Sequence, residues 1–88
     1  MTERASPEVL AALREGIQNQ IAANDPPQVA EAFARLRKEG YSEDVTWRLL
    51  SAALLQEMSL IMRFTRPFDR EGYAKALENL PDLMERDS

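Results

Sequence analysis

Cysteine and histidine are both absent from the 88-residue sequence. Without cysteine, the chain can form neither a disulfide framework nor a thiolate metal site, and nothing indicates an oxidising compartment. Without histidine, it lacks the commonest general base and the commonest nitrogen ligand for zinc, copper or iron. We therefore expect no enzyme that depends on cysteine or histidine, and no metal or other cofactor.

Glycine and strand signals are also scarce. The three glycines are isolated along the chain, so the sequence contains no glycine-rich phosphate loop. No period-two alternation of apolar residues persists, and no Asn-Gly or Asp-Gly hairpin turn occurs. Helix punctuation, in contrast, is frequent, and the sequence predicts an all-α protein.

The charge and the N-terminal segment limit the possible partners. The net charge is −4, which opposes binding to nucleic acid because that affinity comes largely from basic groups. The segment "MTERASPEVL" is polar and lacks the apolar stretch of a signal peptide. We expect a cytoplasmic protein of bacterial type. Its length predicts a single helical domain over residues 1–88, ordered from about 6 to 80, with loose tails at 1–5 and 82–88.

The first two helices have recognisable start and stop signals. Ser6 before Pro7 predicts an N-cap, and Asn24 predicts a left-handed helix end. The buried stripe of this first helix consists of Leu10, Leu13, Ile17 and Ile21. Asp25 is then expected to cap a second helix, with Gln28 completing a capping box and Gly40 ending it. A basic cluster near that end fits compensation of the helix dipole or a phosphate contact; it consists of Arg35, Arg37 and Lys38.

Two further helices follow. Ser42 predicts the N-cap of a long helix that runs to about Phe64, where the segment "RPFD" breaks it. Asp69 predicts the cap of a last short helix that Pro81 stops. The inner face of this last helix consists of Tyr73, Ala76, Leu77 and Leu80. The connections are very short, so we expect a compact antiparallel array of about four helices around one long central apolar helix.

The long helix contains the run "LLSAALLQEMSLIMRF", residues 49–64. Its charged residues exclude a membrane span, which needs about 20 predominantly apolar residues. A helical wheel leaves only one narrow solvent-facing strip; it consists of Arg48, Ala52, Gln56, Ser59 and Arg63. The remaining apolar arc is much wider than the roughly 100° that packing on one side requires.

Two arrangements explain this excess of apolar surface: a central position inside the monomer, or contact with a second chain. We expect the second, a homodimer formed through isologous contacts of the long helix. Aromatic residues and methionine are enriched at protein interfaces. The candidate interface residues are therefore the tryptophan and methionines of the long helix with their apolar neighbours: Trp47, Leu54, Leu55, Met58, Ile61 and Met62.

Glu57 breaks the apolar pattern of the long helix and lies away from the solvent-facing strip. A buried carboxylate must be paired, hydrogen-bonded or protonated. The structural interpretation is a salt bridge to an arginine of another helix or a position at the rim of the interface. The functional interpretation is a site with a raised pKa. Glu15 lies in a polar segment, "REGIQNQ", which fits either a solvated face or a ligand contact.

Three motifs resemble an uncharacterised family of small bacterial all-helical proteins, a domain of unknown function. The resemblance covers roughly residues 10–81, and its motifs are Asn24-Asp25-Pro26-Pro27, Gly40-Tyr41, and Pro67-Phe68-Asp69 with Tyr73 and Leu77. It implies two pairs of histidines four residues apart, a spacing that suits a metal. The matching positions here hold Leu10, Arg14, Asp44 and Arg48, which cannot replace imidazole ligands. The resemblance implies a helical fold and supplies no activity.

These observations favour a non-enzymatic, self-associating protein-interaction module that can also dock another protein. The alternative is a small-molecule or metal-binding helical protein that uses buried carboxylates, namely Glu57 with Glu15.

Overall fold

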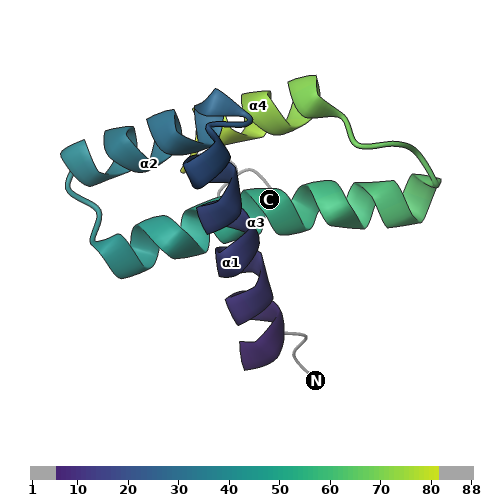
Figure 1. Cartoon of the computed structure of the whole chain (residues 1–88), viewed down its shortest axis with the longest axis horizontal. Coiled ribbons are helices and arrows are strands. Elements are labelled where there is room, and N and C mark those ends of the chain that lie inside the picture. The colour runs from purple at the N-terminus through teal and green to yellow at the C-terminus, as the bar shows by residue number, and fades with distance from the viewer. Residues whose placement is uncertain (1–5, 82–88) are drawn as a thin grey trace.

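The computed structural model describes residues 6–81, and within that range it contains four helices and no strand. The helices are α1 (Pro7–Ala23), α2 (Pro27–Lys38), α3 (Glu43–Phe64) and α4 (Arg70–Asn79). This arrangement confirms the all-α class and the four helices with short connections (Figure 1). The expected tails, residues 1–5 and 82–88, lie outside the described residues.

Three of the four predicted N-caps are present. The Ser6 hydroxyl accepts a hydrogen bond from the Val9 amide at 3.2 Å, and the Ser42 hydroxyl accepts one from the Val45 amide at 3.1 Å. The Asp69 carboxylate accepts a hydrogen bond from the Gly72 amide at 3.0 Å. Each bond satisfies one of the backbone N–H groups that the first turn leaves without a helical partner. The caps therefore fix where α1, α3 and α4 begin.

The predicted cap of α2 is wrong. Pro26 occupies the N-cap position in an extended conformation, and no side chain caps the helix. The helix begins at Pro27, so Asp25 lies one residue outside the capping position and Gln28 is too close to the start to complete a capping box. The Asp25 carboxylate instead accepts a hydrogen bond from Arg70 at 2.6 Å, which links the α1–α2 connection to the start of α4.

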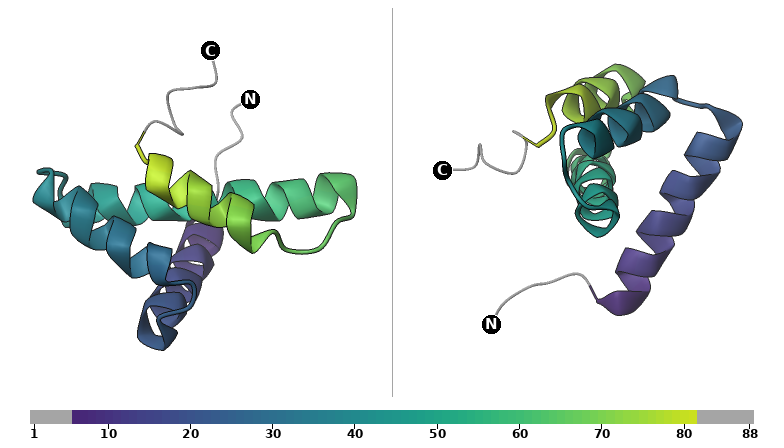
Figure 2. Two further views of the ribbon diagram at one scale, coloured as in Figure 1. Left: turned by 90° about the horizontal axis from the view of Figure 1, so that it is seen from above. Right: turned by 90° about the vertical axis from the view of Figure 1, so that its left-hand side faces the viewer.

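All three other helices pack against α3. Figure 1 shows α2 and α4 running antiparallel to α3, whereas α1 crosses α3 steeply instead of joining the expected antiparallel array. The core lies between these helices, and its fully enclosed side chains are Ile17, Val29, Leu36, Leu50, Tyr73 and Leu77. In Figure 2, α2 and α4 lie side by side along α3, and the first turns of α1 diverge from the rest of the molecule.

The basic cluster at the end of α2 makes local and tertiary hydrogen bonds to carbonyl groups. Arg35 donates to the Leu80 carbonyl at 3.0 Å and to the Leu77 carbonyl at 3.1 Å, both at the C-terminal end of α4. Arg37 donates to the Tyr41 carbonyl at 2.8 Å in the α2–α3 connection. Arg35 therefore gives the Leu80 carbonyl a partner, and it adds a second donor to the Leu77 carbonyl, which also accepts the Leu80 amide at 3.3 Å.

The glycines of α1 and of the α2–α3 connection should respond to alanine in opposite directions. A Cβ on Gly16 would lie 3.6 Å from Leu54 Cδ2, an ordinary contact, so Gly16→Ala should raise the free energy of unfolding by about 0.5–1 kcal/mol. Gly40 has a φ of 104°, so Gly40→Ala should lower that free energy by about 1–2 kcal/mol. Urea unfolding followed by circular dichroism measures both changes. A loss of stability in Gly16→Ala would mean that α1 packs against α3 more tightly than described.

Candidate functional site

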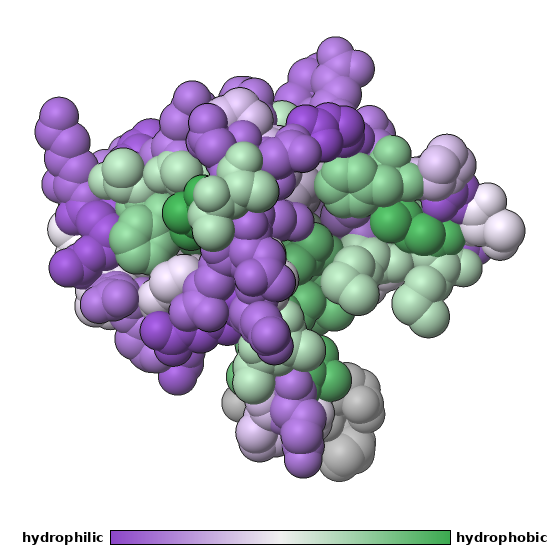
Figure 3. Space-filling model, in the orientation of Figure 1, coloured by the Kyte–Doolittle hydropathy of each residue, from purple (hydrophilic) through white to green (hydrophobic). Residues whose placement is uncertain are grey.

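The C-terminal half of α3 carries an exposed apolar strip. Leu55, Met58 and Met62 lie on one face of the helix because their spacings are three and four residues. Their exposed fractions are 38%, 44% and 79%. We call these three residues the methionine strip. Figure 3 shows apolar side chains gathered along this half of α3, and the described helices of the chain leave the strip uncovered.

The other three predicted interface residues contact their own chain. Leu54 belongs to the core and is only 9% exposed, and Ile61 is half-buried. Trp47 packs against Phe33, with the ring centroids 5.1 Å apart, at the opposite end of α3 from Met62. Of the six predicted interface residues, three therefore form the exposed methionine strip. The other three are partly or wholly buried by contacts within the monomer.

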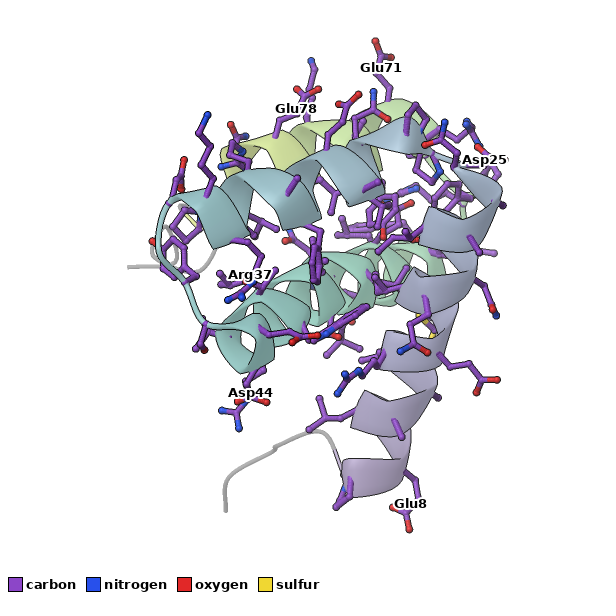
Figure 4. All side chains as sticks on the ribbon, turned by 60° about the vertical axis from the view of Figure 1, so that its left-hand side comes forward. Glu8, Asp25, Arg37, Asp44, Glu71 and Glu78 are labelled. Atoms are coloured by element: carbon purple, nitrogen blue, oxygen red, sulfur yellow. The ribbon has the colours of Figure 1, made fainter. Side chains whose placement is uncertain are left out.

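A groove separates the first half of α1 from α3. Two adjoining cavities of about 280 and 310 Å³ make up this α1–α3 groove. Its lining consists of Leu10, Ala11, Leu13 and Arg14 from α1, and of Asp44, Trp47, Arg48, Ser51, Ala52 and Leu55 from α3. Figure 4 shows the start of α1, marked by Glu8, diverging from the start of α3, marked by Asp44. The groove exists because α1 crosses α3 instead of lying along it.

The sequence did not reveal the groove as a site, because its residues come from two helices that are distant in sequence. The crossing of α1 over α3 decides which side chains meet, and no local pattern encodes that angle. The sequence placed Leu10 in the buried stripe of α1 without distinguishing it from the other members, whereas the structure leaves it 44% exposed. It extends the stripe one turn beyond the part of α1 that α3 covers.

The four positions at which the family resemblance implies histidines all line one cavity of this groove, the one of about 280 Å³. The residues present are a leucine, an aspartate and two arginines, and only the aspartate is a metal ligand. Among residues 6–81, no group of three or more histidine, cysteine, aspartate or glutamate side chains is placed to hold a metal ion.

Glu57 is buried, with 4% of its surface exposed, and its carboxylate is fully paired. Arg66 donates two hydrogen bonds of 2.9 Å, one to each carboxylate oxygen, and the Asp69 amide donates a third at 2.8 Å. These hydrogen bonds, led by those from Arg66, hold the pKa of Glu57 below its ordinary value although burial raises it. The arginine comes from the α3–α4 connection and not from another helix. The arrangement fits the structural interpretation, since the functional one expects a raised pKa.

Glu15 does not join Glu57. It lies exposed on α1, whereas Glu57 lines a small cavity of about 80 Å³ beside Arg66, Asp69 and Tyr73. The Tyr73 hydroxyl donates a hydrogen bond to Gln20 Oε1 at 2.9 Å, which connects α4 to α1. Burial raises the pKa of Tyr73 to about 12, so this phenol stays neutral at physiological pH. The polar groups around Glu57 connect helices to one another.

No helix among residues 6–81 is long and apolar enough to cross a membrane.

Replacing Glu57 should remove a pH-dependent part of the stability. Its pKa is lowered in the folded state, so its stabilising effect is present above the unfolded value of about 4.5 and is lost as the pH falls through the lowered pKa. Glu57→Gln should therefore cost about 1–3 kcal/mol near pH 7, and the difference from the wild type should shrink below about pH 4.5. Urea unfolding of both proteins between pH 3 and 7 measures this. A difference that stays constant over that range would contradict an ionised, arginine-paired Glu57.

Comparisons with protein-family models, with curated proteins and with solved structures found no match to this chain. The family resemblance of the sequence motifs therefore stays a prediction, and the function has to be inferred from the geometry of the methionine strip, the α1–α3 groove and the Glu57 site.

Proposed function

We propose that this protein is a non-enzymatic helical module that self-associates as a homodimer through the methionine strip of α3. The observation that carries the proposal is the exposure of Leu55, Met58 and Met62 on one continuous helix face. Methionine is enriched at protein interfaces, where its flexible side chain adapts to a partner surface. On sequence grounds, we place this dimer in the bacterial cytoplasm.

A second copy of the chain fits the strip because the strip carries no charge. In an isologous contact, each surface meets its own copy, so a charged centre would oppose a like charge. Two charged residues of α3 lie beside the strip, Arg48 and Arg63, and both are exposed and outside it. In an antiparallel two-fold pairing of α3, Met58 lies near the axis. Leu55 then packs against the partner's Met62.

The size of the strip predicts modest affinity. Stable interfaces bury about 800 Å² on each partner, and three side chains alone supply only part of that area. The surrounding surface of α3 has to contribute the rest. We therefore expect dimerisation in the micromolar range, with the monomer folded by itself around its own core.

The chemistry of the chain supports a binding role over catalysis. The sequence has no cysteine or histidine to form a nucleophile–base pair. The buried carboxylate is held in its ionised form by Arg66, which makes it a weak base and a poor acid.

A charge placed in the strip should dissociate the dimer. Met62→Glu introduces two like charges into the paired surface, and we expect the dimer dissociation constant to rise at least about tenfold, which corresponds to 1.4 kcal/mol. Sedimentation equilibrium at tens of micromolar measures the effect. Gln18→Glu adds the same charge to an exposed position of α1 and serves as the matched control. Wild-type protein that remains monomeric at this concentration would refute the proposal.

The antiparallel geometry can be tested separately with a disulfide. The chain contains no cysteine, so Met58→Cys creates a single thiol. If Met58 lies near the two-fold axis, mild oxidation should give a covalent dimer in high yield, because the Cβ atoms of a disulfide lie about 3.5–4.5 Å apart. Lys75→Cys on the exposed face of α4 is the control and should remain largely monomeric. Equal yields from the two variants would exclude this register, and dimerisation by another face would then remain measurable by sedimentation.

A further inference from the structure

The α1–α3 groove combines apolar walls with two guanidinium groups. Leu10 and Leu13 form the α1 wall, and Trp47 and Leu55 form much of the α3 wall. Its two adjoining cavities, about 280 and 310 Å³, together approach the size of a small-molecule site. Such sites are mostly apolar and contain a few polar groups that orient the ligand. The groove is separate from the methionine strip except for the shared Leu55.

Arg14 is the polar group that is best prepared to meet a ligand. Its guanidinium lies 4.7 Å from the centroid of the Trp47 ring, so the ring holds the cation at the wall of the groove. No carboxylate among residues 6–81 lies within salt-bridge distance of Arg14. A guanidinium offers a fork of N–H donors that matches a carboxylate.

Neither of the two acids beside the groove forms an ion pair with Arg14. Asp44 pairs with Arg48 at 3.2 Å, and the Glu43 carboxylate accepts a hydrogen bond from the Trp47 indole N–H at 3.5 Å. Among residues 6–81, Arg14 is thus the charged side chain of the groove lining that has no ion-pair partner, and its charge is positive. The groove therefore favours an anion over a cation.

We propose that the α1–α3 groove binds a medium-chain alkyl carboxylate. The alkyl chain lies between Leu10, Leu13 and Leu55, and the carboxylate accepts hydrogen bonds from Arg14 beside the Trp47 ring. Arg48 lies at the rim, where Asp44 already pairs with it at 3.2 Å, so its contribution is smaller than that of Arg14. A bare inorganic anion would leave the apolar walls in water, and an uncharged alkyl chain would leave Arg14 without a partner. The class of ligand follows from having both features in one groove.

Trp47 is the only tryptophan of the chain and lines the groove, so its fluorescence reports binding directly. Titration of the full chain with sodium decanoate, below its micelle concentration, should give a saturable change. Affinity should rise about two- to fourfold for each methylene added between hexanoate and decanoate, as buried alkyl groups do. Inorganic phosphate and decanol should each bind more weakly than decanoate.

Substitutions distinguish a site that recognises the carboxylate from an apolar surface that binds only the alkyl chain. Arg14→Gln should weaken decanoate binding about three- to fivefold, the range of a partly exposed ion pair, and should leave decanol binding unchanged. Arg48→Gln should have a smaller effect of the same sign. Lys75→Gln, which removes a positive charge from the distant α4, is the matched control. Calorimetry gives the affinities independently of Trp47 fluorescence, and circular dichroism verifies folding.

Two results would overturn the proposal: no saturable decanoate binding, or equal binding of decanoate and decanol with no effect of Arg14→Gln. Neither result depends on the oligomeric state, since both are measured at a protein concentration below the dimer dissociation constant. The groove and the dimer can therefore fail separately.

Discussion

Packing against α3 is the constraint on which the rest of this structure depends. The other three helices contain 17, 12 and 10 residues, and isolated helices shorter than about 12–15 residues are marginal in water. They are stabilised by burying their apolar stripes against α3, whose Leu50 and Ala53 are enclosed almost completely. Three short helices cannot cover a helix of 22 residues that is apolar around most of its circumference. The methionine strip results from this incomplete cover, and the α1–α3 groove results from the steep crossing of α1 over α3.

The Glu57 site shows how the chain makes its sharpest change of direction without leaving charges unpaired in the interior. α3 ends at Phe64, and the next residues must turn back towards α4. Arg66 lies in that turn and bonds to a carboxylate two and a half helical turns earlier, while the Asp69 amide bonds to the same carboxylate. One buried acid therefore positions both ends of the connection. A buried ion pair adds little net stability over an apolar contact, but removal of one partner is costly.

Local features of the fold were predictable from the sequence, whereas tertiary features were not. The caps at Ser6, Ser42 and Asp69 depend on side chains within three residues of their targets, and all three are present. The cap at Asp25 failed because two adjacent prolines shifted the helix start by one residue. The wheel separated Glu57 from the solvent-facing residues, but its partner was not encoded locally. The crossing of α1 over α3, and with it the groove, depends on which side chains meet at Gly16 and Leu54, and this geometry has no signature in one-dimensional spacing.

The hydrogen bonds from Arg35 to the end of α4 make two helices interdependent. α4 has no glycine in a left-handed conformation at its end; the chain simply becomes extended at Leu80. Arg35 of α2 supplies hydrogen-bond donors to the last carbonyls of α4, which a local C-cap would otherwise provide. α4 therefore cannot be removed by itself without consequence, because its loss would break the hydrogen bonds of Arg35 to Leu77 and Leu80 and uncover the inner face of α2. α2 and α4 therefore form one structural unit. The hydrogen bonds of Arg35 join them across more than forty residues of chain.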